Sequence, residues 1–143
     1  MKKFELTQEF IIYHDKTLYR IKALFDFGNV KRGNLGGFVE RETNLSQDGD
    51  AWVYGNAKVY GDAEVYGNAW VCGDARVCKL EDYIVFKNFW SSGRYFTWTR
   101  SNDMWKVGCF FGKGKDLIKK AYKDSKTSGK NYEKIVNYVE SIK

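Results

Sequence analysis

Between Ala51 and Val77 the chain repeats a pattern of six residues. Each copy runs through Ala, a variable residue, Val, a Tyr or Cys, Gly, and then Asn or Asp. The copies begin at Ala51, Ala57, Ala63, Ala69 and Ala75, the last of them incomplete. A period of six, with small and β-branched residues alternating before a glycine corner, is typical of a hexapeptide β-helix, in which each copy forms one short flat strand and a turn. The repeat therefore predicts an architecture, and by itself it predicts no reaction.

Alternation along each short strand predicts which side chains face the interior. Successive side chains in a strand point to opposite sides, so Ala51 and Val53 are expected inside and Trp52 and Tyr54 outside. If three copies complete one triangular coil, residues eighteen apart stack on each other. The stacking pairs are then Trp52 with Trp70, Tyr54 with Cys72, Lys58 with Arg76, and Tyr60 with Cys78.

The strip formed by Trp52 and Trp70 has two interpretations. Stacked tryptophans form an apolar surface that a free monomer seldom leaves exposed. Either the C-terminal hairpin or helices fold back over it, or a partner binds there. A short coil also exposes unpaired strand edges at its two ends, which favours self-association into a homo-oligomer. The outward residues predicted to contact a partner are Trp52, Trp70, Tyr54, Lys58, Arg76 and Tyr60.

The rest of the chain is expected to cap the repeat on both sides. We predict one domain over 1–143, divided into an N-terminal β-hairpin cap over 1–32, the hexapeptide β-helix over 33–80, a β-hairpin region over 81–112 and C-terminal helices over 113–143. The N-terminal strands are expected at 10–13 and 17–25. Helical spacing of apolar residues near the C-terminus is broken at 125–129. The predicted fold class is mainly β, a short β-helix with flanking β-hairpins and a C-terminal helical segment.

The charge balance favours acidic partners only mildly. Lys and Arg number 24 against 18 Asp and Glu, a net charge of +6. Nucleic acid, a nucleotide or an acidic protein surface fits that balance, and a solvated, Lys-rich C-terminal helical face fits it as well. No apolar run approaches the ~18 residues that span a bilayer, and no signal peptide follows the first residues, so we expect a cytoplasmic protein without membrane contact.

Catalytic candidates are few. Acyltransferases with a hexapeptide β-helix use a histidine base at a subunit junction, whereas His14, the one histidine of the chain, falls in the predicted N-terminal turn. Cys72, Cys78 and Cys109 have neither a neighbouring base in the sequence nor CxxC spacing. The sequence therefore predicts no catalytic residue, no metal site and no cofactor, and it argues against acyltransferase activity.

The predicted hairpin after the repeat combines cations with aromatic rings. Such a combination can stack on bases and neutralise phosphates. The residues of this candidate anionic-ligand site are Arg94, Trp98, Arg100, Trp105 and Lys106.

Four motifs flank or interrupt the repeat, at 18–24, 36–40, 44–47 and 105–110. Together with the repeat they resemble a family of small proteins encoded in bacteriophages and prophages. The repeat alone is shared with polymer-forming cytoskeletal proteins and hexapeptide transferases, so the flanking motifs are the more particular part. The resemblance implies a left-handed coil and a phage accessory protein, and it carries no catalytic residue over to this chain.

The resemblance also implies a role in the host cell. Small proteins from such genomes often bind and block host machinery, so the first hypothesis is a counter-defence inhibitor of a bacterial immune component such as a CRISPR-type nuclease. Trp52 and Trp70 would be its anchors. The second hypothesis is sequestration of an anionic signalling nucleotide by Arg94, Trp98, Arg100 and Lys106. The third is a self-assembling structural protein that associates through its coil edges. All three hypotheses are non-enzymatic.

Overall fold

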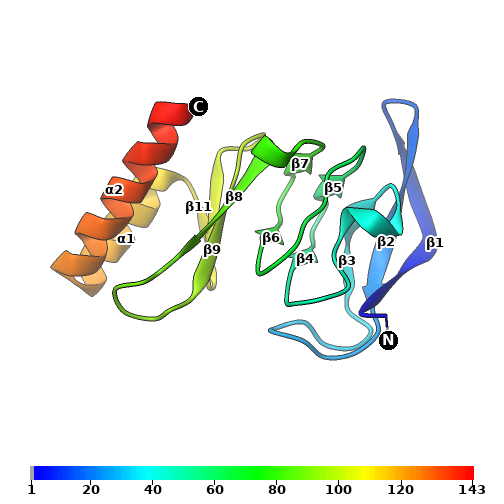
Figure 1. Cartoon of the computed structure of the whole chain (residues 1–143), viewed down its shortest axis with the longest axis horizontal. Helices are drawn as coiled ribbons and strands as arrows, with labels where there is room; N and C mark the ends of the chain where they lie inside the picture. The colour runs from blue at the N-terminus through cyan, green and yellow to red at the C-terminus, as the bar shows by residue number, and fades with distance from the viewer. Residues whose placement is uncertain (1) are drawn as a thin grey trace.

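The structure is a computed structural model that describes residues 2–143 (Figure 1). It is mainly β, with several sheets and two C-terminal helices. An N-terminal hairpin lies at one end of the long axis, short parallel strands occupy the middle, and an antiparallel sheet with the helices forms the other end (Figure 1). None of the helices within residues 2–143 combines the length and the apolar character that crossing a bilayer requires.

The N-terminal hairpin consists of β1 (Phe4–Tyr13) and β2 (Lys16–Ala23). His14 and Asp15 both have positive φ, 48° and 64°, as the type I′ turns favoured between antiparallel strands require. The predicted hairpin is confirmed, but β1 begins at Phe4 rather than at residue 10. A register shift between Leu6 and Phe10 interrupts the pairing, and it hides the first part of the strand from a search for simple alternation.

Short parallel strands follow the repeat. Trp52 pairs with Trp70 and Lys58 pairs with Arg76, as the eighteen-residue stacking predicts. The sheet of the hairpin continues in the order β1-β2-β3-β5-β7, through β3 (Leu35–Val39), β5 (Lys58–Val59) and β7 (Arg76–Val77), while β4 (Trp52–Val53) pairs with β6 (Trp70–Val71). The ladders stay separate sheets that do not close on one another. Two short 3₁₀ turns are η1 (Glu42–Asn44) and η2 (Leu80–Asp82).

Small side chains fill the space between the parallel ladders. Ala51 and Val53 are fully buried, and the Ala and Val of each later copy are buried too. Gly55 and Gly73 stand at equivalent corners with φ of 69° and 71°, a left-handed conformation that favours glycine. A Cβ atom on Gly55 would also lie 3.3 Å from the backbone of Gly73. The repeat therefore keeps glycine at these corners for backbone conformation and for close stacking.

Trp52 is buried, which corrects its predicted place on an exposed outer face. Its side chain is 2% exposed, and its ring lies edge-on to Phe4 at 6.5 Å and to Phe27 at 5.2 Å between centroids. β1 and the segment after β2 supply these two rings. The cover over this tryptophan thus comes from the N-terminal part of the chain, not from the C-terminal hairpin or helices.

The second half of the chain forms an antiparallel sheet with two different faces. One face carries Phe96, Trp98 and Trp105, which pack with residues of the helices in a second core cluster. Thr97 points the other way, and its hydroxyl accepts the N–H of Trp70 at 3.0 Å. The strand order is β11-β10-β9-β8, with bounds β8 (Tyr83–Lys87), β9 (Tyr95–Thr99), β10 (Met104–Val107) and β11 (Phe110–Gly112).

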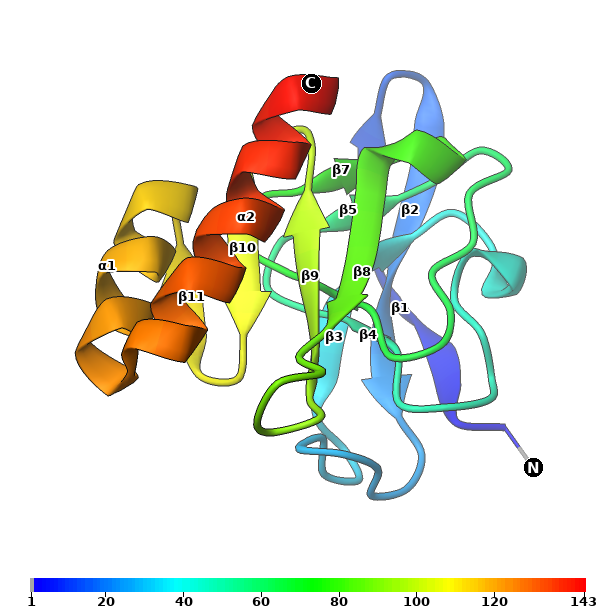
Figure 2. The ribbon, with the colours of Figure 1, turned by 60° about the vertical axis from the view of Figure 1, so that its left-hand side comes forward.

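Two helices, α1 (Gly114–Asp124) and α2 (Lys126–Ile142), lie against this sheet (Figure 2). They meet at Ser125, so the predicted break over 125–129 is too long. The Ser125 hydroxyl caps α2 by accepting the N–H of Ser128 at 3.0 Å. Gly129 lies inside α2, where a Cβ atom would fall 2.3 Å from the ring of Tyr122. This glycine therefore permits close packing of the helices and does not interrupt them.

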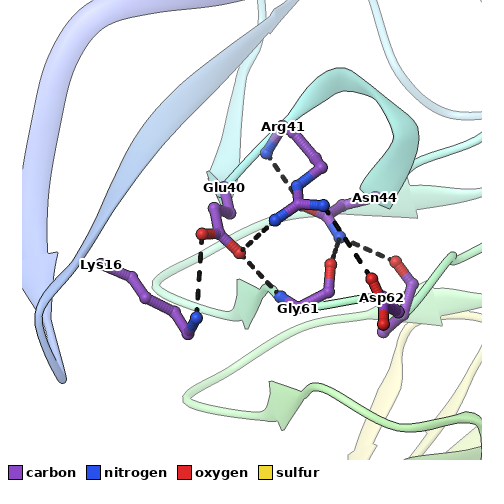
Figure 3. A network of polar contacts seen from close by, with 7 residues as sticks. Lys16, Glu40, Arg41, Asn44, Gly61 and Asp62 are labelled. Atoms are coloured by element: carbon purple, nitrogen blue, oxygen red, sulfur yellow. Dashed lines mark hydrogen bonds and ion pairs between the residues drawn. The ribbon is translucent and has the colours of Figure 1, made fainter.

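A polar network fastens the N-terminal hairpin to the repeat (Figure 3). The Glu40 carboxylate accepts the N–H of Gly61 at 2.8 Å and lies 3.9 Å from Lys16 Nζ and 3.4 Å from Arg41 Nη2. The Gly61 hydrogen bond, aided by the two cations, holds the pKa of Glu40 below its ordinary value although desolvation opposes this. Asn44 donates to the Gly61 carbonyl at 3.2 Å. The corner at Gly61 is thus held through both its N–H and its C=O.

Candidate functional site

A pocket of about 430 Å³ opens where three parts of the chain meet. Its walls come from the segment after β2, from the repeat around β6, and from the sheet residues around β9 and β10. They bring together two cations, one carboxylate, two amides and two aromatic rings. The lining residues are Gly28, Asn29, Asp50, Asn68, Trp70, Arg94, Tyr95, Thr97, Lys106 and Gly108.

Trp70 is held in place at the pocket wall by hydrogen bonds and by an aromatic contact. Its backbone N–H donates to Thr97 Oγ1 at 3.0 Å, and its indole Nε1 donates to the Asp50 carbonyl at 3.2 Å. The Tyr54 ring meets it edge-on at 5.5 Å between centroids. Trp70 is only partly buried, so a fixed aromatic surface remains at the pocket wall.

Two cations reach the pocket from the antiparallel sheet. Lys106 stands opposite Thr97 in the pairing of β10 with β9, and its Nζ lies 5.9 Å from the centroid of the Tyr54 ring. Arg94 precedes β9 and approaches Gly108, where a Cβ atom would lie 3.1 Å from Arg94 Nη1. Among residues 2–143, neither cation forms an ion pair within 4.0 Å. Both charges are therefore free to attract an anion.

Cys72, the cysteine near Lys106, is not an activated nucleophile. It is buried beside Tyr54, and burial raises the pKa of its thiol to about 11, although the nearby Lys106 ammonium acts in the opposite direction. Burial likewise raises the pKa of Tyr54 to about 12. Both groups are protonated at neutral pH. Within the described part of the chain, no group of three His, Cys, Asp or Glu side chains is placed to hold a metal ion.

The predicted anionic-ligand site comes together only in part. Arg94 and Lys106 both line the pocket. Trp98 and Trp105 are 0% and 1% exposed on the helix-covered face of the sheet, so a ligand from solvent cannot reach them, which corrects their predicted role. Arg100 is engaged elsewhere: its Nε donates to the Glu81 carbonyl at 3.0 Å and its guanidinium lies 5.1 Å from the Trp98 ring centroid.

The predicted partner-binding residues separate into three places. Trp52 is buried under the N-terminal segment. Trp70 lines the pocket, and the Tyr54 ring lies edge-on against it. The remaining three, Lys58, Arg76 and Tyr60, gather on another surface with Tyr13 of the hairpin.

These last four residues form what we name the basic face: Tyr13, Lys58, Tyr60 and Arg76. Arg76 Nη1 donates to Tyr13 Oη at 3.2 Å, Lys58 Nζ lies 5.4 Å from the Tyr13 ring centroid, and the Tyr13 and Tyr60 rings are 5.6 Å apart. The hydrogen bond with Tyr13 raises the pKa of Arg76. Tyr13 was not apparent from the repeat because it belongs to β1, at the far end of the hairpin.

Sequence reasoning also missed five polar or aromatic side chains of the pocket, Asn29, Asp50, Asn68, Tyr95 and Thr97. Asn68 occupies the Asn or Asp position that follows each glycine of the repeat. Since this turn position already explains the residue, its second role in the pocket was not predicted. Strand alternation carried a usable signal, because it places neighbours such as Trp105 and Lys106 on opposite faces and so separates them into core and pocket. The remaining residues come together only through the tertiary fold.

Comparison with known proteins gives a partial similarity. No family model matches the chain. The uncharacterized acetyltransferase YdcK of Escherichia coli (strain K12) is 39% identical over 62 residues, which covers 38% of this chain and 19% of YdcK. The chain thus spans about a fifth of the length of that relative. The similarity hints at a relationship with hexapeptide-repeat proteins and gives no support to a phage origin.

Proposed function

We propose that this chain is a non-catalytic binding protein whose pocket at Trp70 takes an anionic ligand with a flat aromatic part, the chemistry of a nucleotide. The observation that carries the proposal is the convergence of Arg94 and Lys106 on one pocket beside Trp70, where neither cation forms an ion pair with any of residues 2–143. Phosphate oxygens are common partners of arginine and lysine side chains in proteins.

The other pocket residues fit the same ligand chemistry. A base can stack on an indole face, which is worth about 1–3 kcal/mol per base in single-stranded nucleic-acid sites. Asn29, Asn68 and Asp50 offer amide and carboxylate groups to the polar edge of a base. The volume of about 430 Å³ is within the range of small-molecule sites.

The fold that supports the pocket is, in this proposal, a short left-handed hexapeptide β-helix over 33–80 within a single domain. The eighteen-residue pairings of Trp52 with Trp70 and of Lys58 with Arg76 support it, as does the parallel bridge between Leu45 and Val65. A phage accessory protein with a counter-defence role stays the biological hypothesis. Sequestration of a signalling nucleotide would serve that role.

The non-catalytic part of the proposal is supported by where His14 and Cys72 lie. His14 is exposed at the tip of the hairpin with its ring against Tyr13, 4.2 Å between centroids, and it does not line the pocket. Cys72 keeps its proton at neutral pH. The similarity to an acetyltransferase nevertheless makes acetyl-coenzyme A, itself a nucleotide, a necessary member of any ligand panel.

Calorimetric titration of the full chain with linear and cyclic nucleotides, coenzyme A and acetyl-coenzyme A tests the proposal. We expect one class to bind, and at 100 times its Kd it should stabilise the fold by about 2.7 kcal/mol. Arg94→Ala and Lys106→Ala should each weaken binding about tenfold or more, because hydrogen bonds to charged groups are worth about 1.5–3 kcal/mol. Lys58→Ala, which removes a cation from the basic face, is the matched control and should leave Kd unchanged.

Two results would contradict the proposal. Absence of binding across the panel, or binding that Arg94→Ala and Lys106→Ala leave intact, would remove the pocket as a nucleotide site. Transfer of an acetyl group from acetyl-coenzyme A to an amine or hydroxyl acceptor would instead refute the non-catalytic part alone.

The basic face supports a second candidate function, binding of an acidic protein target such as a host immune nuclease. Lys58 and Arg76 stand side by side on it, and Tyr13 and Tyr60 add aromatic surface. Tyrosine and arginine are enriched among residues that dominate interface energies.

Affinity capture from a bacterial lysate should then enrich one protein, and Lys58→Glu with Arg76→Glu should abolish the capture while Arg94→Ala preserves it. Equal capture by all three forms would refute this candidate.

A further inference from the structure

The outer edge of β8 is an unpaired strand edge. β8 is the last strand of its sheet and pairs only with β9. Hydrogen bonds at both ends of this pairing, from Arg100 N–H to Asp82 and from Asn88 N–H to Arg94, fix which residues bond inward. By the alternation of an antiparallel ladder, Tyr83, Val85 and Lys87 direct their backbone N–H and C=O groups away from β9. Within residues 2–143 no other strand pairs with them.

The two faces of β8 are nevertheless covered. Ile84 and Phe86 pack against the helix-side core cluster, and Val85 packs against the core of the repeat. The strand is therefore held in place by its side chains while its backbone edge stays open. Natural proteins usually protect such an edge with proline, bulges or several charges, and β8 has one charged residue, Lys87, and no proline.

Exposed apolar side chains bracket the same strand. Leu80 precedes it and Phe89 follows it, and each is 74% exposed, more than any other large apolar side chain described in residues 2–143. A groove of about 510 Å³ runs beside the edge, with Tyr66, Tyr83 and Tyr95 among its walls. An open edge between two exposed apolar residues is the pattern of an interaction surface rather than of a solvated strand.

We propose that the β8 edges of two copies of this chain pair in antiparallel fashion, which joins two four-stranded sheets into one. The outward groups of β8 limit the pairing to registers that place Tyr83, Val85 and Lys87 opposite one another, and the register that uses all three in both copies is centred on Val85. Val85 stands opposite Val85 of the second copy on the two-fold axis, and Tyr83 stands opposite Lys87 of the second copy. Because the axis reverses the strand, every contact occurs twice.

The side chains around β8 are complementary to themselves under this symmetry, which is why the partner is a second copy. The reversal brings Leu80 of one copy close to Phe89 of the other, so the two most exposed apolar side chains lie at the same ends of the paired edge. It also brings the exposed Glu81, just before the strand, near Lys87 of the other copy, diagonal to it across the pair. An unrelated extended peptide would explain the open edge but not this matched arrangement of apolar and opposite charges.

Sedimentation equilibrium of the full chain over a concentration series tests the dimer. We expect a mass that rises from one chain to two with concentration. Val85→Pro should give a single-chain mass throughout, because proline removes an outward N–H that the monomer does not use and an edge strand tolerates it there. Val85→Thr retains the N–H and is the matched control, so it should dimerise.

A charge exchange tests the same register without touching the backbone. Lys87→Glu should weaken the dimer at least threefold by placing two carboxylates together, and Glu81→Lys combined with Lys87→Glu should restore it. A single-chain mass for the wild type up to millimolar concentration would overturn the proposal. A dimer that survives both Val85→Pro and Lys87→Glu would overturn it as well, since that dimer would use another surface.

Discussion

Lys3 is the most deeply buried charged side chain in the described part of the molecule. It is 1% exposed, its Nζ donates to the carbonyls of Ala51 at 2.7 Å and Gly49 at 3.2 Å, and it lies 4.9 Å from the Phe27 ring centroid. Desolvation lowers the pKa of Lys3 to about 8, against the opposing attraction of Asp50 and Asp48. The Lys3 side chain thus links the start of β1 to the repeat, but burial of its charge costs desolvation free energy.

Because the pKa of Lys3 is lowered in the folded protein, the free energy of unfolding should change with pH in the alkaline range. The unfolded lysine keeps its proton up to about pH 10.5, whereas the folded one loses it near pH 8. Between these values unfolding takes up a proton, so the free energy of unfolding rises with pH. Urea denaturation of the wild type and Lys3→Met at pH 7.5, 8.5 and 9.5 should show the difference moving in favour of the wild type, by up to about 1 kcal/mol per pH unit.

Comparing the two proteins removes the contribution of other titrating groups. Cys72 acts in the opposite direction, because its pKa is raised to about 11 by burial, so stability is lost as pH rises from the unfolded value of 9.0. That loss is common to both proteins. A constant difference between wild type and Lys3→Met from pH 7.5 to 9.5 would contradict the burial of a charged Lys3.

The last strands of the two parallel ladders, β6 and β7, donate backbone N–H groups to side-chain hydroxyls rather than to another strand. Thr97 accepts the N–H of Trp70 at 3.0 Å, and the Ser101 hydroxyl accepts the N–H of Arg76 at 2.7 Å. β6 and β7 are the strands at this end of their ladders. Side chains from the antiparallel sheet thus satisfy backbone groups that would otherwise be open for pairing.

Thr97→Val tests how much this closure contributes. The substitution keeps the shape of the side chain and removes the acceptor, so it leaves the Trp70 N–H without a partner. We expect the free energy of unfolding to fall by about 1–3 kcal/mol, measured by urea denaturation. Thr17→Val on the hairpin is the control and should change it by less than about 0.5 kcal/mol. Equal effects of the two substitutions would mean that the hydroxyl has no capping role.

The sequence predicts those elements whose pattern lies within a short stretch of the chain, and it does not predict contacts between distant segments. The glycine corners and the Ala and Val alternation repeat every six residues, so the parallel pairing of Trp52 with Trp70 could be predicted from that spacing alone. The burial of Trp52 could not, because Phe4 and Phe27 cover it from outside the repeat. The pocket could be predicted only in part. Arg94 and Lys106 were predicted from their charge, whereas Asp50 is brought beside them only by the tertiary fold.

Residues 2–143 form two apolar cores that meet where the antiparallel sheet lies against the repeat. One core lies within the parallel strands and the N-terminal hairpin, and the other lies between the antiparallel sheet and the helices. Beyond the two hydroxyl caps, the Tyr83 hydroxyl joins them by donating to the Glu64 carbonyl at 2.8 Å. The pocket lies at this junction, so both cores are needed to form it.

We expect the two cores to unfold together, because Val85 and Tyr83 of the second sheet pack into the first core. Tryptophan fluorescence can follow each core separately. Trp90→Phe, Trp98→Phe and Trp105→Phe together leave the emission of the first core, because Trp90 also packs against the second core, and Trp52→Phe with Trp70→Phe leaves that of the second. In each variant the urea midpoint from fluorescence should coincide with the midpoint from circular dichroism. Two separated transitions within one variant would indicate that the cores are independent units.

The pairing of Lys58 with Arg76 shows that eighteen residues add one strand to a parallel ladder, so the number of repeats sets the length of this part of the molecule. One further set of eighteen residues, inserted in phase, would lengthen the molecule by about 4.8 Å, the spacing between neighbouring strands. The hairpin at one end and the hydroxyl caps at the other would keep their partners, and the column of cations would gain a third member. Insertion of six residues would instead turn every later side chain onto a different side. Length and surface charge in such a chain can therefore change together, in steps of eighteen residues, while both ends stay the same.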